Sequence, residues 1–224
     1  MGYVLILVAV IVVFLLLRAG ASSHREAVRR ALRADEPVPI EEFPDGAIAT
    51  IAGRIRYGQQ TLRSPLSDRR CTYYYAHVKK NRTDAGGASL AAEEDARPFF
   101  VEDATGWALV ALDSDVNVTG MVEVVKDRHK HQGLFGDAEE TIVRFLKRHD
   151  QPAAGVLFNK LLHFEEGVLA EGEAVRVRGL GRWETDPTGD RPGRGYRAQG
   201  RQLVLRAPGD GQLYISDDPE LLEP

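Results

Sequence analysis

The chain contains one cysteine, Cys71, among 224 residues. A single thiol excludes an intrachain disulfide framework, and it excludes a zinc module built from several thiolates. The chain also lacks an excess of positive charge, because 29 Lys and Arg residues stand against 33 Asp and Glu residues, for a net charge of −4. A nucleic-acid-binding protein needs a basic face, so the composition predicts no nucleic-acid partner.

Long hydrophobic runs are absent apart from one, Tyr3–Leu17. As a helix, residues 1–21 would rise about 31 Å, which matches a bilayer core of ~30 Å. A cleaved secretory signal is the alternative, but the run has no basic residues before it and no persuasive small-x-small cleavage site after it. We therefore predict that residues 1–21 form a transmembrane anchor.

Positive charge gathers directly after this run. Between residues 18 and 33 the chain has five arginines and one glutamate. The positive-inside rule then predicts a single-pass protein of the cell membrane, with its N-terminus outside and its C-terminal domain in the cytoplasm. Residues 22–42 are predicted to form a basic juxtamembrane helix and a proline-containing linker, and this basic neck is predicted to contact anionic membrane lipid.

Residues 43–224 are predicted to form one domain built mainly of strands. Runs of β-branched and aromatic residues between turn residues predict strands at Ala47–Arg56, Cys71–Lys80, Pro98–Glu102, Trp107–Leu112, Met121–Lys126, Leu161–Glu166, Glu173–Glu184, Gln202–Arg206 and Leu213–Ser216. Residues 81–97 are rich in Ala, Gly and acids and predict a mobile loop. Gly179 and Gly181, two residues apart inside a strand, predict a bulge or bend.

One amphipathic helix interrupts the strands. Asp137 and Glu140 have the spacing of a capping box, apolar residues follow at helical spacing, and Pro152 ends the pattern. The predicted fold is therefore α+β, mainly β. It consists of an N-terminal transmembrane helix followed by a curled antiparallel sheet or small barrel with one packed amphipathic helix.

The stretch Leu62–Val78 changes abruptly from turn residues to strand residues. Alternation places Cys71, Tyr73, Tyr75 and His77 on one face, and the other face is also bulky, so a central strand is predicted. The motif S-P-L-S-D-R-R-C-T-Y-Y resembles the signature of the GIDE family, Ala/Ser-Pro-Leu-Ser-Gly-x-x-Cys-Val-x-Tyr. Asp68 replaces the family's glycine and Thr72 its valine, and aspartate tolerates a left-handed backbone. Weaker matches follow in order at Phe99–Gly106, Val168–Gly179 and Ile215–Asp217.

The resemblance implies a BAM (beside-a-membrane) domain, which in this family is regarded as the part that binds substrates or partners. Family members of animal and plant organelles look like ubiquitin ligases, in which a zinc-binding RING supplies the ligase activity. One cysteine cannot build a RING, so this chain is similar to members that lack one. Intrinsic ubiquitin transfer is therefore not expected.

The cysteine and several histidines are candidates for a catalytic or metal site, and each also has a simpler structural interpretation. Cys71 and His77 are about 20 Å apart along a strand, so they cannot pair there, and a small buried cysteine is the better interpretation. His129 and His131 share a strand face, but Arg128 and Lys130 beside them oppose a cation. We predict no metal and no cofactor.

The predicted function is a membrane-anchored, cytoplasm-facing module that binds an unknown protein partner. The alternatives are a ubiquitin-ligase-like component that acts with a partner, or a hydrolase that depends on Cys71. Candidate binding residues lie on three loops, since loops on a rigid scaffold usually carry binding groups. They are Pro65, Leu66, Arg69, Arg70, Leu134, Phe135, Arg191 and Arg194. Leu134 and Phe135 have the alternative role of packing the start of the helix into the core.

Overall fold

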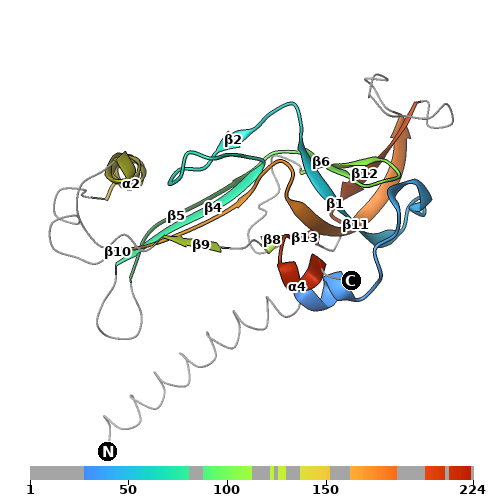
Figure 1. Cartoon of the computed structure of the whole chain (residues 1–224), viewed down its shortest axis with the longest axis horizontal. Coiled ribbons are helices and arrows are strands. Elements are labelled where there is room, and N and C mark those ends of the chain that lie inside the picture. The colour runs from blue at the N-terminus through green and yellow to red at the C-terminus, as the bar shows by residue number, and fades with distance from the viewer. Residues whose placement is uncertain are drawn as a thin grey trace, which may run out of the picture.

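The computed structural model describes residues 28–80, 88–112, 122–123, 126–129, 137–151, 162–185, 200–209 and 212–222. Within these ranges the chain is built mainly of strands, with a barrel at one end and an extended sheet at the other (Figure 1). The elements in chain order are a helix at residues 28–33, η1 (Ile40–Glu42), β1 (Ile48–Tyr57), β2 (Leu62–Arg63), β3 (Arg70–Cys71), β4 (Tyr73–Lys80), β5 (Ala88–Ala96), β6 (Phe99–Glu102), β7 (Trp107–Val110), β8 (Val122–Glu123), β9 (Lys126–His129), α2 (Asp137–Arg148), β10 (Leu162–Leu169), β11 (Ala174–Thr185), β12 (Arg201–Arg206), β13 (Tyr214–Ser216) and α4 (Pro219–Leu222).

Five strands close into a barrel in the order β1-β6-β7-β12-β11, and β11 pairs back onto β1. All pairs in this ring are antiparallel except β7–β12, which is parallel. Numbered along the chain, the ring reads 1-2-3-5-4-1 with the third and fifth strands parallel. This is the connectivity of the OB-fold, a five-stranded Greek-key barrel. β13 and β8 extend the sheet beyond β11.

Alternation along each strand fills the barrel. Ile51 and Ile55 of β1 point inward together with Phe99 and Val101 of β6, and all four are fully buried. Burial of such side chains stabilises the fold by roughly 1.5–3 kcal/mol each. The neighbouring strands contribute Ala108, Val110, Val175, Val177, Leu203, Leu205 and Ile215 to the same core.

Gly179 and Gly181 of β11 allow neighbouring side chains to pack closely against the strand backbone. The predicted bulge at these glycines is wrong. The residues of β11 pair without interruption with β1 and β12. A Cβ at Gly181 would lie 2.2 Å from the ring of Phe43, and one at Gly179 would lie 2.5 Å from Leu213. The chain therefore needs glycine where side chains cross the β11 backbone.

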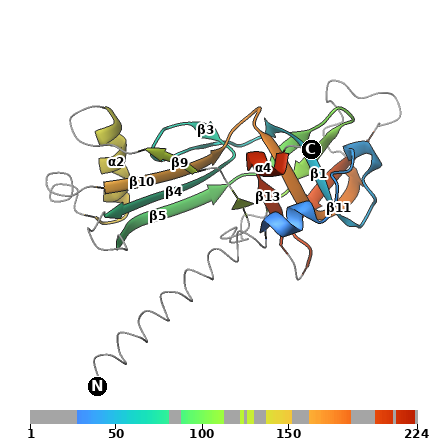
Figure 2. The ribbon, with the colours of Figure 1, turned by 60° about the horizontal axis from the view of Figure 1, so that its bottom comes forward.

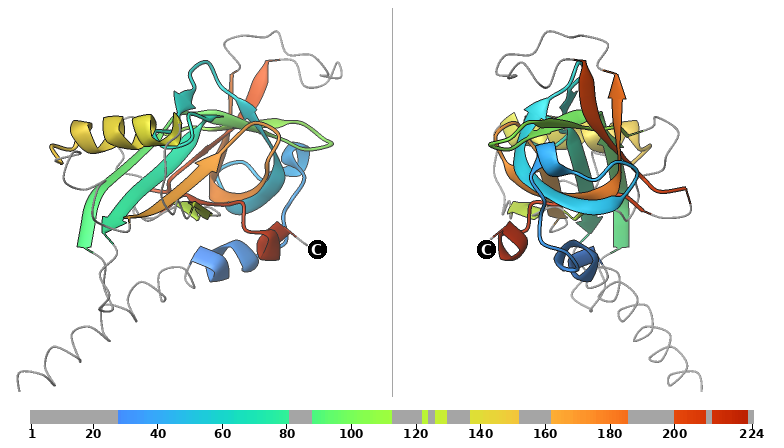
Figure 3. Two further views of the ribbon diagram at one scale, coloured as in Figure 1. Left: turned by 60° about the vertical axis from the view of Figure 1, so that its left-hand side comes forward. Right: turned by 90° about the vertical axis from the view of Figure 1, so that its right-hand side faces the viewer.

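A second sheet, in the order β5-β4-β10-β9, extends from the barrel, and α2 covers one of its faces (Figures 1 and 3). Tyr74, Ala76 and Val78 of β4 share an apolar cluster with Ile142, Phe145 and Leu146 of α2. We call this side of the sheet the α2 face. The predicted helix is confirmed, and it begins at Asp137.

The predicted loop at residues 81–97 is wrong for its second half, because residues 88–96 form β5. Alanine and glutamate have low strand propensity, so composition argues against a strand here. Pairing with β4 overrides that preference. Tyr73 and Tyr74 of β4 also donate hydrogen bonds to the carboxylates of Glu94 and Glu93 on β5.

The predicted architecture, a transmembrane helix followed by a curled antiparallel sheet or small barrel, is also corrected. The described fold is mainly β, with a closed five-stranded barrel, few helices and two parallel strand pairs. Its α2 helix has 12 residues, about 18 Å in length, against a bilayer core of ~30 Å. Within the described ranges no helix is long and apolar enough to span a membrane. Residues 1–21, to which the sequence assigns the single-pass span, lie outside those ranges.

The two ends of the described chain pack together. The helix at residues 28–33 lies beside α4 in every view (Figures 2 and 3). Val28 and Leu32 form a buried cluster with Leu221, and Arg29 donates two hydrogen bonds to the carboxylate of Asp218. Part of the predicted basic neck therefore contacts acidic residues of the C-terminal segment.

We expect Leu32→Ala to lower the free energy of unfolding by about 2–5 kcal/mol, because it leaves a cavity at a fully buried site. Arg33→Ala is the control, since Arg33 is half-exposed and its pair with Glu220 spans 3.8 Å. An exposed pair of this kind contributes at most about 1 kcal/mol. Urea denaturation measures both, and equal stabilities would show that this helix does not belong to the folded unit.

Candidate functional site

The motif turn, Ser64–Arg69, is a compact loop between β2 and β3. The amide of Ser64 donates to the carbonyl oxygen of Arg69 at 2.9 Å, and Asp68 donates to the carbonyl oxygen of Ser64 at 3.0 Å. Asp68 has a φ of 55°, so it adopts the left-handed conformation that glycine favours and that aspartate tolerates. The predicted turn chemistry is confirmed.

A buried carboxylate holds this turn on the α2 face of the sheet. Glu166 of β10 is 2% exposed, and its Oε1 accepts hydrogen bonds from the amides of Leu66 at 2.8 Å and Ser67 at 3.3 Å. Bonds to a carboxylate are stronger than neutral ones, and they satisfy an acid that would otherwise be costly to bury. Glu166 therefore fixes where Pro65 and Leu66 lie.

Cys71 lies on the α2 face and not with His77. The predicted shared face is wrong, because the backbone bends at Thr72 and leaves Cys71 in the cluster of Tyr74 and Ala76. Burial, and next the negative charge of Glu166, raise the pKa of the Cys71 thiol from 9.0 to about 12. A neutral thiol in an apolar cluster does not act as a nucleophile.

Both arginines of the motif contact other side chains of the same chain. Arg69 donates to Glu173 at 3.0 Å, while the guanidinium of Arg70 lies 4.6 Å from the centre of the Tyr57 ring. Pro65 and Leu66 are half-buried, and Leu66 packs against the helix cluster. These four residues hold the turn in place, and their role in partner binding stays a prediction.

The remaining candidates lie outside the described residues: Leu134, Phe135, Arg191 and Arg194. The same holds for His131, and the side chain of His129 in β9 is also not described. Among the described side chains, no group of three His, Cys, Asp or Glu residues is arranged to hold a metal ion.

A second candidate surface, separate from the motif turn, lies on the outside of the barrel. Phe100, Trp107, Leu109 and Val204 point outward from three neighbouring strands, because their neighbours in sequence fill the core. Phe100 pairs with Leu109 across β6 and β7, and Leu109 pairs with Val204 across β7 and β12. The rings of Phe100 and Trp107 are 6.1 Å apart and tilted by 55°. We call these four residues the barrel strip.

A polar group without a partner lies beside the strip. Gln202 precedes Leu203 on β12, so its side chain points outward near Trp107 on the adjacent strand. Gln202 is 4% exposed, yet its Nε2 has no hydrogen-bond acceptor among the described residues. An unsatisfied buried amide costs about 1–3 kcal/mol.

Ion pairs border the strip on both sides. Arg56 donates to Glu102 at 2.6 Å on the β1 side, and Arg206 pairs with Glu184 on the β11 side. The strip thus has an apolar centre with a charged margin, the usual anatomy of a protein interface. The sequence signal was the alternation Phe99-Phe100-Val101-Glu102, which places one phenylalanine of the pair outside the barrel.

Comparison with known proteins identifies no relative. No protein-family model matches the chain, and no curated protein and no solved structure matches it either. The resemblance to the GIDE family rests on the motif residues alone.

The raised pKa of Cys71 predicts a loss of stability in alkali. A thiol whose folded pKa lies above its unfolded value stabilises the fold below about pH 9, and that contribution is lost as the pH rises toward about 12. Between about pH 8 and about pH 10 the unmodified protein should lose about 1.4 kcal/mol more stability than Cys71→Ala. Urea denaturation at both pH values measures this difference, and parallel losses would contradict the buried neutral thiol.

Proposed function

We propose that this protein is a protein-binding module and that the barrel strip is its partner-binding surface. The proposal depends on two half-buried aromatic rings that lie beside a buried amide with no acceptor in the described part of the chain. The rings provide apolar contact area, and the amide provides a specific polar contact. Both belong to strands of the barrel, so they are held in fixed positions.

The aromatic pair favours a protein partner. Tryptophan and other aromatic residues are enriched at interfaces, where a few of them carry most of the binding energy. Phe100 and Trp107 meet on the outside of a two-stranded hairpin whose turn is fixed by Asp103. Ordering them on binding therefore costs little conformational entropy.

The amide of Gln202 favours a partner that offers a hydrogen-bond acceptor. A main-chain carbonyl of an extended segment can fill this role, with an adjacent apolar side chain against Trp107 and Leu109. Such a contact would satisfy a donor that has no partner among the described residues. The ion pairs at the margin then select partners by charge.

One analogy supports this surface and a second supports a binding function. In OB-folds the face formed by the second and third strands binds ligands, namely oligonucleotides and oligosaccharides, and β6 and β7 take those places here. The motif at Ser64–Tyr74 resembles the GIDE family, in which the BAM domain is regarded as the partner-binding part. The chain has too few thiolates for a RING, so we propose binding without ubiquitin transfer of its own.

The first test is quantitative capture of proteins by the immobilised protein and by Trp107→Ala. Truncation of a central interface aromatic costs about 2 kcal/mol or more, which corresponds to roughly a 30-fold loss of affinity. Ile48→Ala is the matched control, because Ile48 is 49% exposed on β1 away from the strip. The same partners should bind the control and be lost from Trp107→Ala.

Gln202→Leu separates binding from folding in the same assay. Removing this amide should leave the free energy of unfolding unchanged or higher, because it eliminates a buried donor that finds no acceptor among the described residues. Partner capture should nevertheless fall with the loss of the polar contact. If Gln202→Leu and Trp107→Ala both retain the partners of the control, the barrel strip is not the binding surface.

A further inference from the structure

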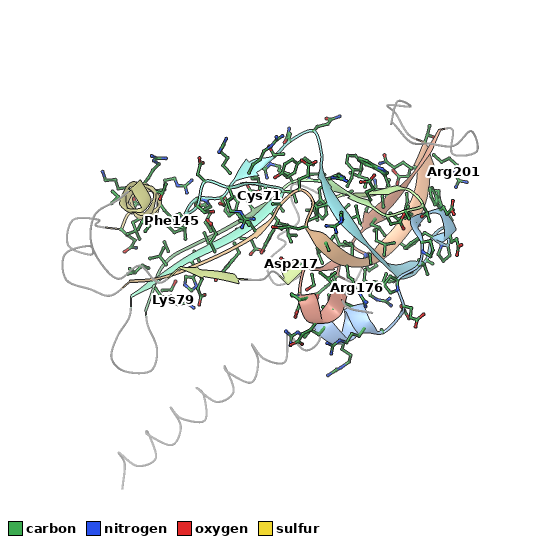
Figure 4. All side chains as sticks on the ribbon, viewed as in Figure 1. Cys71, Lys79, Phe145, Arg176, Arg201 and Asp217 are labelled. Carbon is green, nitrogen blue, oxygen red and sulfur yellow. The ribbon has the colours of Figure 1, made fainter. Side chains whose placement is uncertain are left out.

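The face of the four-stranded sheet opposite α2 carries a chain of polar side chains. Tyr75, His77 and Lys79 alternate with the residues that contact α2, so they point to the other side. Figure 4 shows Lys79 and Phe145 on opposite sides of the sheet. Glu165 of β10 stands directly opposite His77. We call this side of the sheet the polar face.

A β-bulge brings a serine onto the same face. β4 and β5 pair regularly up to Val78 and Ala91, and then the register shifts so that Lys79 stands opposite Ser89. Without the shift Lys79 would face Leu90, and Ser89 would point toward α2. A shift of one residue reverses which face a side chain occupies, and bulges are frequent beside active sites for this reason.

The resulting contacts join a hydroxyl, an imidazole and an acid. The Oγ of Ser89 lies 2.8 Å from Nε2 of His77. The other imidazole nitrogen, Nδ1, lies 3.0 Å from the hydroxyl of Tyr75 and 3.9 Å from Oε2 of Glu165. His77 and Glu165 are largely buried, with side chains 13% and 10% exposed, whereas Ser89 is exposed to solvent.

This arrangement has the features of an activated nucleophile. A serine becomes reactive when an adjacent base accepts its proton and a third group orients that base. With Nδ1 protonated and donating to the Tyr75 oxygen, Nε2 of His77 accepts the hydrogen bond of the Ser89 hydroxyl and can take its proton. Glu165 then stabilises the imidazolium that forms. Ser89 and His77 are the reacting groups, and Tyr75 and Glu165 position the imidazole.

Lys79 adds a positive charge to the polar face. It stands opposite Ser89 in the register, and its ammonium group donates to Glu165 at 3.0 Å. An ammonium has three donor hydrogens, so this bond leaves donors for a second acceptor. A cation on this face can stabilise negative charge that develops on an ester carbonyl oxygen.

We propose that Ser89 is a nucleophile for acyl transfer from carboxylic esters, with His77 as its general base. The Ser89 Oγ bonds to the ester carbonyl carbon while its proton passes to Nε2 of His77. The carbon–oxygen bond to the alcohol then breaks, and the alcohol leaves with the proton from His77. Water attacks the acyl-serine, gives its proton to His77, and releases the acid and free Ser89. The exposure of Ser89 fits small or accessible esters.

The test is covalent labelling of the whole protein with a fluorophosphonate probe, located by mass spectrometry. Attack by Ser89 on phosphorus displaces fluoride and leaves a stable adduct. We expect an adduct on Ser89 that is absent from Ser89→Ala and at least tenfold slower in His77→Gln. Ser67 is the control residue, because it is an exposed serine whose Oγ contacts Ser64 and should stay unlabelled.

Two further readouts separate catalysis from structure. The labelling rate should rise with pH along a histidine titration between about pH 5 and about pH 8, because only the neutral imidazole accepts the proton. The unmodified protein should also release p-nitrophenol from p-nitrophenyl acetate faster than folded Ser89→Ala. An unlabelled Ser89, a rate independent of pH in that range, or equal ester turnover by Ser89→Ala would overturn the proposal.

Discussion

Closure of the barrel by the pairing of β1 with β11 is the constraint on which the rest of the structure depends. Seven residue pairs, from Ile48–Leu180 to Arg54–Ala174, form this seam. β11 also carries β12 and β13 on its other edge, and it follows β10 after a four-residue turn. Tyr73 of β4 and Leu169 of β10 end in the barrel core, so the closed barrel anchors the extended sheet.

Both proposed functional surfaces follow from this frame. The barrel strip exists because Phe99 and Val101 turn inward and leave Phe100 outside, on a hairpin held between β1 and β12. The polar face exists because α2 takes the apolar side of β4 and leaves His77 on the other side. The two surfaces have different chemistry, one suited to docking and the other to proton transfer.

The sequence predicts the elements that depend on local pattern. β1, the hairpin of β6 and β7, and the helix at Asp137 follow from alternation, turn residues and capping. Alternation also places Phe100 outside the barrel, so this residue of the barrel strip can be predicted from the sequence. β5 could not be predicted from the sequence, because its alanines and glutamates form a strand only through pairing with β4. The meeting of Ser89 with His77 depends on a bulge that composition does not reveal, and the bend at Thr72 likewise reversed the predicted face of Cys71.

Native-state hydrogen exchange measured by NMR tests barrel closure most directly. The amides of Ile55, Gly172 and Gly181 make the hydrogen bonds at the two ends of the seam, with acceptors at 2.9 Å across it. The closed barrel predicts that the Ile55 and Gly181 amides exchange only through global unfolding, as slowly as amides between β6 and β7. Exchange of these seam amides at a much lower free energy, with β6 and β7 still protected, would show that the barrel is open.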